Sequence, residues 1–299
     1  MPELPEVENL RLGLERSILG QKIIKIKVNK PKLVSGNGTK RAASAQKVSE
    51  FEQGLTGEKF IAVERRAKNL LFKLSHGKLF LVHLKMSGQF VYQGKGSKKL
   101  IEGGHPIELS ETELPNKHTH VIFTLQKGTL FYNDTRMFGY LLYYPNLKTF
   151  EAKNHFGVYG AEPLQKEFTY KYFSEALKNK KGKIKAVLMD QKIVTGLGNI
   201  YADESLFESG IHPDRTPSSL SPLEIKKLHT AIIRILKKAV KVGGSSVATY
   251  RLLDDTRGNY AREHKVYGKD GENCPNCGHK LVKTIVGGRT TIFCPSCQK

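Results

Sequence analysis

The sequence has no long apolar run. No stretch of its 299 residues approaches the roughly 20 apolar residues that a transmembrane helix needs. Its first residues also lack the apolar core of a signal peptide, because Glu3, Glu6 and Glu8 interrupt them. We therefore expect a cytoplasmic protein that has no membrane partner.

Cysteine is absent from most of the chain, since all four cysteines lie at or after Cys274. Cys274 with Cys277 and Cys294 with Cys297 form two CxxC pairs, separated by sixteen residues. This spacing argues against disulfide bonds and matches a tetrahedral zinc site in which each pair supplies two thiolates. A redox dithiol or ordinary buried cysteines are the alternatives. Four thiolates leave no open coordination position, so we expect one structural Zn²⁺ and no organic cofactor.

Acidic residues are few compared with basic ones. Lysine and arginine number 49 against 28 acids, which gives a formal net charge of +21. A positive charge of this size indicates a polyanionic partner, and nucleic acid is the commonest. Ribosomes and anionic membranes are the competing interpretations. With 39% hydrophobic residues, the chain should still form ordinary hydrophobic cores.

The first half of the chain has the pattern of one helix followed by many short strands. Pro5 suits a first helical turn, and apolar residues then recur at helical spacing. Short apolar or alternating segments predict strands at 22–28, 58–64, 70–74, 78–84, 119–125, 129–133 and 139–144. One helix with many short strands predicts a β-sandwich or barrel that has a helix at its entrance.

The second half is predicted to be helical after a linker at 146–165 that contains proline, glycine and asparagine. Its helical patterns lie at 167–180, 182–191, 199–209 and 221–242. The predicted fold class is therefore α+β. It has an N-terminal helix plus β-sandwich domain at 1–145, a helical domain at 166–262, and a C-terminal zinc-finger β-hairpin at 263–299.

The segment between the two cysteine pairs predicts that hairpin. Two apolar segments flank Gly287, Gly288 and Arg289, which places Arg289 at the tip. A hairpin closed by zinc would present one arginine rigidly. From spacing alone, an arginine on a solvated turn is the simpler interpretation.

Asn199 follows a glycine-containing turn and begins a predicted helix. The structural explanation is an N-cap residue. The N-terminus of a helix is also a ready site for phosphate, and the nearby Lys180 and Lys185 favour phosphate binding. The two roles can coexist.

Three further stretches place a cation at a predicted strand end: RRAK at 65–68, HLKMSG at 83–88 and NDTRMFG at 133–139. Taken singly, each fits solvated cations, with Met86 and Phe138 in the core. Taken together, apolar wedges beside arginine are what a protein needs to hold a DNA duplex open where a base has left it.

These motifs together resemble those of the bacterial formamidopyrimidine-DNA glycosylases, bifunctional enzymes that remove oxidised purines such as 8-oxoguanine. The matching motifs, in order, are MPELPEVE at 1–8, RRAK at 65–68, HLKMSG at 83–88, D-x-R-x-F-G at 134–139, LMDQKIVTGLGNIYADE at 188–204, GIHPDR at 210–215, VYG-x-x-G at 266–271 and the cysteine tail. The resemblance implies base excision repair of damaged double-stranded DNA by a nucleoid-associated monomer. It also implies a helix-two-turns-helix DNA-binding domain in the helical half.

The resemblance assigns the catalytic chemistry to the N-terminus. A helix start explains Pro5, but not Pro2 or Glu3, which precede the helix. Once Met1 is removed, the secondary amine of Pro2 would attack C1′ of the damaged nucleotide. An α-amino group titrates near about 7.7–8.0, against about 10.4 for lysine, so more of it is nucleophilic at pH 7. Glu3 would act as the general acid, supported by Glu6.

Further roles follow from the same resemblance. Lys68 would transfer a proton in β-elimination and Arg289 in δ-elimination. Met86, Arg136 and Phe138 would fill the void left by the flipped nucleotide, with Arg136 facing the opposite base. The positions that contact the DNA backbone, or lie beside those that do, are His83, His118, Lys180, Lys185, Asn199 and Tyr201.

Two rival functions stay open at this point. Endonuclease VIII removes oxidised pyrimidines with the same chemistry, but its members usually have glycine where this chain has Leu4. A non-catalytic DNA-binding protein would use only the helical turn and the zinc hairpin. The presence of Pro2, Glu3 and Lys68 argues against that second rival.

The chain departs from the family in three segments. Residues 31–47 and 94–117, rich in Gly, Ser and Lys, are expected to be surface loops and are longer than in comparable enzymes. Residues 243–262, which cover the flipped base in the family, keep the Gly-Gly start and the Gly258 and Tyr260 end but differ between them. The sequence therefore leaves the lesion preference open.

Overall fold

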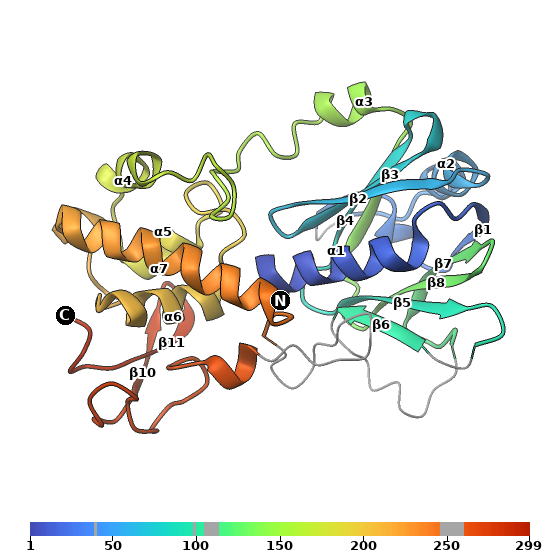
Figure 1. Ribbon diagram of the computed structural model, residues 1–299. Coiled ribbons are helices and arrows are strands. Elements are labelled where there is room, and N and C mark those ends of the chain that lie inside the picture. The colour runs from blue at the N-terminus through green and yellow to red at the C-terminus, as the bar shows by residue number, and fades with distance from the viewer. Residues whose placement is uncertain (39–40, 98–99, 105–113, 246–259) are drawn as a thin grey trace. The chain divides into compact units, whose positions relative to one another are not determined.

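The computed structural model describes the whole chain except residues 39–40, 98–99, 105–113 and 246–259 (Figure 1). It divides into two compact units: Met1–Phe156 with Gly243–Asn259, and Gly157–Val242 with Tyr260–Lys299. No helix in the described part of the chain combines the length and the hydropathy needed to cross a bilayer.

The first unit contains two antiparallel sheets, with strand orders β1-β7-β8-β5-β6 and β2-β3-β4-β9. The strands are β1 (Ile23–Val28), β2 (Phe60–Arg66), β3 (Asn69–Leu74), β4 (Leu79–His83), β5 (Gly88–Gly94), β6 (Leu100–Gly104), β7 (Thr119–Leu125), β8 (Gly128–Asp134) and β9 (Tyr140–Tyr144). The predicted β-sandwich is confirmed.

The strand register gathers three predicted functional loops. His83 pairs with Asn69 on one side and with Tyr140 on the other, and Gly88 pairs with Asp134 in the second sheet. The turn before β3, the turn after β4 and the segment before β9 therefore meet at one end of the unit. These turns carry the RRAK, HLKMSG and DTRMFG motifs.

Helix α1 (Leu4–Ile18) contributes one face to the core that both sheets share (Figure 1). The apolar residues of that face, all fully buried, are Val7, Leu10, Leu14 and Ile18. Burying each such side chain stabilises the fold by about 1.5–3 kcal/mol. Phe80 of one sheet stacks on Phe123 of the other, with ring centroids 5.7 Å apart. This core fixes the N-terminus of α1 relative to the strands.

Helix α2 (Ala45–Leu55) is an unpredicted element. It begins inside the expected loop 31–47, where Ser44 caps it by accepting a hydrogen bond from the Lys47 N–H at 3.2 Å. Phe51 and Leu55 are buried on its inner face. Their spacing was a helical signal, so the expectation of a loop to residue 47 was wrong.

Three more elements depart from expectation. β5 was not predicted, and β6 lies inside the expected loop 94–117. The short helix α3 (Leu147–Ala152) lies inside the expected linker, capped by Asn146, which accepts from the Thr149 N–H at 2.9 Å. The conformation of β5 depends on its pairing with β8, that of β6 on its pairing with β5, and that of α3 on a single cap.

The second unit is built on four helices: α4 (Tyr170–Lys178), α5 (Ile184–Met189), α6 (Asn199–Ser209) and α7 (Pro222–Lys241). Short 3-10 helices across the two units are η1 (Pro31–Leu33), η2 (Ser75–Gly77), η3 (Pro217–Ser219) and η4 (Tyr260–Glu263). Leu228, Ile232 and Leu236 recur at helical spacing on the buried face of α7. They pack in one core with side chains of α4, α5 and α6.

The C-terminal hairpin consists of β10 (Val282–Val286) and β11 (Arg289–Phe293). Gly287 and Gly288 both have positive φ, at 57° and 72°, as the tight turn of such a hairpin requires. The predicted hairpin, and with it the predicted α+β fold class, is confirmed.

Candidate active site

The expected nucleophile and its acids lie at the start of α1. Pro2 is buried, and Glu3 and Glu6 are each 3% exposed. Glu3 is the N-cap residue: its N–H donates to Glu6 Oε2 at 2.8 Å, and its side chain accepts from the Glu6 N–H. Glu3 therefore precedes the helix as expected, but the expectation that a helix start does not explain it was wrong, because this capping box satisfies N–H groups that a helix start leaves open.

Glu6 also holds the start of a second segment. Its Oε1 accepts a hydrogen bond from the Ser245 N–H at 2.8 Å. Gly244 has φ +79°, and a Cβ there would lie 2.8 Å from Glu6 Oε1, so the close approach needs glycine. The segment expected to cover the flipped base begins here; most of it, residues 246–259, lies outside the described residues.

An ion-pair chain ties the RRAK turn to α1. Glu8 on α1 pairs with Arg65 at 2.7 Å and with Arg11 at 2.7 Å. Burial raises the pKa of Glu8, but hydrogen bonds and charge from Arg11 and Arg65 outweigh it and hold the pKa below its usual value. Arg65 also donates to the Ala67 carbonyl at 3.0 Å. The buried Lys68 follows directly in this braced turn.

His83 lies at the end of β4, close to Lys68 and Lys85. Burial, together with the positive charges of these two lysines, lowers the pKa of His83 to about 3. The ring is therefore neutral at physiological pH, and its Nδ1 accepts a hydrogen bond from the Lys85 N–H at 2.9 Å. His83 holds the turn after β4; its contact with DNA stays a prediction.

The expected void-filling side chains come from two joined loops. Met86 and Phe138 are 37% and 47% exposed, so neither side chain is in the core. The Arg136 guanidinium lies 4.9 Å from the Phe138 ring centroid, within cation–π range. Ser87, next to Met86, donates to Asp134 Oδ1 at 2.5 Å and so links the loops.

Asp134 is the central support of these loops, and sequence reasoning gave it no role. Its carboxylate accepts from the Arg136 N–H at 3.2 Å and the Gly139 N–H at 2.8 Å. Its backbone N–H donates to the carbonyl of the half-buried His118 at 3.1 Å. Asp134 is the first residue of the D-x-R-x-F-G motif at 134–139, and this position was the available signal of its role.

All three loops contain backbone strain. Among the residues described, five non-glycine residues have positive φ, and three of them lie in these loops: Ala67 at 58°, Lys85 at 54° and Met137 at 52°. Such conformations cost about 1–3 kcal/mol each and cluster at functional sites. The strain supports a functional role for this end of the unit.

In the second unit, Lys185 has a different role from the one expected. It is 0% exposed, and its ammonium pairs with Asp203 at 2.7 Å. It also donates to the Thr290 carbonyl at 2.9 Å and to Thr291 Oγ1 at 2.7 Å. We therefore assign Lys185 to holding β11, since a buried, fully engaged ammonium has no surface to offer a phosphate.

The other expected DNA contacts of this unit differ in exposure. Lys180 is exposed, whereas Tyr201 is fully buried and its ring lies 5.6 Å from that of Tyr260. Gly198, not Asn199, is the N-cap of α6, so the N-cap interpretation was wrong. Asn199 Nδ2 instead donates to the Thr290 carbonyl at 3.1 Å. Thr290 is thereby anchored, and the exposed Arg289 directly precedes it.

The four cysteine sulfurs fit a zinc ion. They all lie within 4.8 Å of one another, with Cys274 to Cys297 at 3.8 Å and Cys277 to Cys294 at 3.5 Å. Tetrahedral Zn–S bonds of about 2.3 Å place sulfurs about 3.8 Å apart. The site holds one structural Zn²⁺, which staples the ends of the hairpin.

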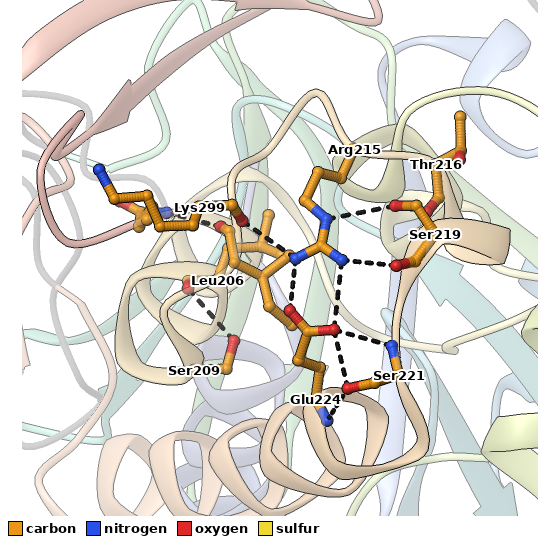
Figure 2. Close-up of polar contacts among 10 residues, drawn as sticks. Leu206, Ser209, Arg215, Thr216, Ser219, Ser221, Glu224 and Lys299 are labelled. Atoms are coloured by element: carbon orange, nitrogen blue, oxygen red, sulfur yellow. Dashed lines mark hydrogen bonds and ion pairs between the residues drawn. The ribbon is translucent and has the colours of Figure 1, made fainter.

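Arg215, from the GIHPDR motif, joins three segments (Figure 2). Its guanidinium pairs with Glu224 of α7, donates to the Ser219 carbonyl at 2.6 Å, and donates to the Lys299 carbonyl at 3.1 Å. The Arg215 hydrogen bond lowers the pKa of Glu224 to about 2. The segment after the last cysteine pair is thereby attached to the helices.

Glu204 of α6 anchors the VYG motif. Its Oε1 accepts from the N–H groups of Lys265, Val266 and Tyr267 at 3.1, 3.0 and 2.8 Å. Successive N–H groups that converge on one carboxylate fix the entry to the zinc tail. The GIHPDR and VYG motifs, which have no expected catalytic role, thus attach the C-terminal tail to the helices.

Comparison with known proteins identifies the class. The model "Formamidopyrimidine-DNA glycosylase N-terminal domain" matches residues 1–141, and "Formamidopyrimidine-DNA glycosylase H2TH domain" matches 159–251. "Zinc finger found in FPG and IleRS" matches residues 271–299. The fold and site define a DNA glycosylase that carries a zinc finger.

Individual relatives extend the match over the whole chain. The formamidopyrimidine-DNA glycosylases of Desulfitobacterium hafniense and Streptococcus pyogenes are 39% and 41% identical, covering 100% of this chain and 100% and 99% of theirs. The solved complex of a Lactococcus lactis variant with DNA containing Fapy-dG is 36% identical, covers 100% of both chains and has a TM-score of 0.85. The chain belongs to the formamidopyrimidine-DNA glycosylase family and is an enzyme of base excision repair, a DNA glycosylase with AP lyase activity.

Proposed function

We propose that this enzyme excises oxidised purines, including 8-oxoguanine and formamidopyrimidines, from damaged double-stranded DNA by using Pro2 as its nucleophile. After removal of Met1, the Pro2 nitrogen forms a bond to C1′ while the glycosidic bond breaks and the base leaves with its electron pair. A secondary amine gives an iminium that has no N–H to lose, so it stays an electron sink for β- and then δ-elimination.

The observation that carries this proposal is the capping box beside Pro2. It places two buried carboxyl groups, Glu3 and Glu6, at fixed positions immediately after the nucleophile. Glu3 then protonates the ring oxygen of the sugar as the ring opens. Glu6 keeps Glu3 in place and holds the Ser245 segment.

The remaining roles divide between the units. In the first, Lys68 moves the proton in β-elimination, while Met86, Arg136 and Phe138 occupy the space left by the flipped nucleotide. In the second, Arg289 acts in δ-elimination and contacts phosphate. His83, His118, Lys180 and Asn199 are the further proposed DNA contacts, and Tyr201 and Lys185 support them from buried positions.

The test is covalent trapping. Borohydride should trap the protein on a duplex with 8-oxoguanine opposite cytosine, and Pro2→Gly or a form that keeps Met1 should lose most trapping. Pro5→Ala is the matched control, because it removes the neighbouring proline and leaves the amine. No trapped species with any oxidised-base duplex would refute the Pro2 mechanism.

Glu3→Gln separates the two roles of Glu3. Glutamine keeps an oxygen that can cap α1 but has no acid proton to give. We expect thermal stability close to that of the wild type with excision slowed at least about a hundredfold, the usual contribution of a general acid. Wild-type excision by this variant would assign Glu3 to capping alone.

A second trapping substrate tests the range of lesions. A Lactococcus lactis complex with DNA containing an oxidised pyrimidine is 35% identical to this chain, with a TM-score of 0.83. Thymine glycol opposite adenine should therefore be compared with 8-oxoguanine opposite cytosine. Faster turnover of the pyrimidine lesion would contradict the proposed preference for purines.

A further inference from the structure

The loop that follows Asp134 presents Arg136 and Phe138 to solvent on a strained backbone. Met137, between them, has φ +52°. A non-glycine residue keeps this conformation only when its surroundings hold it there. The loop therefore needs fixed partners for its backbone N–H and carbonyl groups.

Asp134 satisfies three N–H groups of the loop. Asp134 accepts from the Arg136 N–H and the Gly139 N–H, at 3.2 and 2.8 Å. The Met137 N–H donates to the Asp134 carbonyl at 3.3 Å. A carboxylate can only accept, so it leaves the carbonyl groups of the loop to another partner.

Arg41 supplies the missing donors. Its Nη2 donates to the Gly139 carbonyl at 2.5 Å and to the Met137 carbonyl at 3.0 Å. Its Nη1 donates to the Phe138 carbonyl at 3.5 Å. One guanidinium thus donates to three consecutive carbonyl groups, whereas the Asp134 carboxylate accepts from the N–H groups of the same loop.

Arg41 comes from a segment that had no assigned purpose. It lies in the expected insertion 31–47, and the base of its loop is closed by Ser35. Ser35 Oγ donates to the Pro31 carbonyl at 2.7 Å and accepts from the Ser44 N–H at 3.1 Å. The two sides of the loop are therefore pinned together before Arg41 reaches the second loop.

We propose that Arg41 is a positioning residue that fixes the loop of Arg136 and Phe138, so that the 31–47 insertion helps to set how the enzyme reads the base opposite the lesion. This inference rests on the proposed function, in which these two side chains enter the duplex. The planar guanidinium suits the task because its donors form a rigid fork and it has no acceptor.

Hydrogen exchange tests the brace without DNA. Arg41→Ala should speed amide exchange in 134–139 by about tenfold, because the loop opens more often, while exchange in β4 and β8 stays unchanged. Lys47→Ala is the matched control: it removes a cation from the same segment, where Lys47 pairs with Glu50 at the surface and does not brace the loop. Unchanged exchange in 134–139 on Arg41→Ala would overturn the proposal.

Opposite-base discrimination tests its consequence. Arg41→Ala should slow excision of 8-oxoguanine opposite cytosine by about tenfold and opposite adenine by less, so the ratio of the two rates falls. A folding defect lowers both rates equally and leaves the ratio unchanged, and that result would overturn the positioning role. Arg41→Lys should stay closer to alanine than to the wild type, because an ammonium lacks the planar fork whose two nitrogens, Nη1 and Nη2, reach these carbonyl groups together.

Two results separate this inference from its alternatives. Arg41→Ala could reduce the slope of DNA affinity against salt concentration by the amount expected for one phosphate contact, and leave the ratio of the two excision rates unchanged. Arg41 would then contact DNA directly, and the proposal would be wrong. If the wild type acts on neither duplex, the proposed function has failed, whereas the exchange comparison still decides whether Arg41 braces the loop.

Discussion

The two segments that carry proposed DNA-facing arginines are held by different chemistry. The hairpin of Arg289 is closed by four thiolates around Zn²⁺ and docked by the buried ammonium of Lys185. The loop of Arg136 is held by hydrogen bonds from Asp134 and Arg41. The hairpin has a few strong attachments, so it should stay folded or unfold as a whole. The loop has several weaker hydrogen bonds, so it can open and close locally.

Removal of zinc should have the largest effect on this comparison. Structural zinc contributes about 10–16 kcal/mol of apparent binding free energy, so a chelator or Cys294→Ser should unfold the hairpin. Zinc content and hydrogen exchange should show loss of protection in β10 and β11, with 134–139 unchanged. Ser296→Ala is the control, because Ser296 lies between Cys294 and Cys297 but is not a zinc ligand, and this variant should keep zinc bound. A protected hairpin without metal would remove the distinction between the two segments.

Breaking the buried ion pair should come next. Lys185→Met leaves the Asp203 carboxylate buried without its cation, and we expect a loss of about 3–5 kcal/mol in the free energy of unfolding. Denaturant titration measures it. Adding Asp203→Leu removes the stranded charge and should recover most of the loss. If the double variant is no better than the single one, the pair is not the source of the effect.

The same variant has a predicted pH dependence. Burial raises the pKa of Asp203 to about 7, even against the opposing charge of Lys185. Without Lys185 the folded carboxyl binds its proton still more tightly than the unfolded one does. The folded state then holds more protons above about pH 4, so stability should fall as pH rises, and the fall should continue to higher pH than in the wild type.

The hydrogen-bonded loop should respond less. Asp134→Asn places an amide N–H₂ where Gly139 also donates, so that one hydrogen bond is lost and two donors face each other. We expect a loss of about 1–3 kcal/mol, seen in thermal unfolding and in faster exchange of 134–139. Glu64→Gln, on an exposed pair with Lys73, is the control. Equal effects from both substitutions would contradict a special role for Asp134.

The smallest effect is expected at Arg215. Its pair with Glu224 is partly exposed, so Arg215→Lys should cost about 0.5–1 kcal/mol. The pKa of Glu224 is about 2 in the folded state and 4.5 ordinarily. The pair therefore stabilises the protein fully above about pH 4.5 and loses its effect as pH falls towards 2. Urea titrations at pH 7 and pH 3 should show the difference between variant and wild type shrinking in acid; a constant difference would contradict this linkage.

Local patterns allowed much of the fold to be predicted from sequence. α6 and β7 have the predicted limits, because a glycine-containing turn precedes α6 and a short run rich in β-branched and aromatic residues forms β7. The hairpin follows from Gly287 and Gly288, which adopt the φ values that its turn needs. The zinc ligands follow from the spacing of the cysteines.

The supports of the site could not be predicted in the same way. Lys185 stands in a run of lysines that favours an exposed side chain, yet the carbonyl it contacts lies 105 residues away. Arg41 meets the loop of Phe138 across 97 residues. Such contacts depend on the folded chain, so the sequence pointed to the groups that do chemistry and missed those that hold them.

The Thr290 carbonyl offers a direct optical reading of hairpin docking. It accepts hydrogen bonds from both Lys185 and Asn199, at 2.9 and 3.1 Å, so two helices share one oxygen. Two donors on one carbonyl weaken the C=O bond and lower its stretching frequency. A single ¹³C=¹⁸O label at this residue would therefore make the infrared spectrum a gauge of whether the hairpin is seated as DNA arrives.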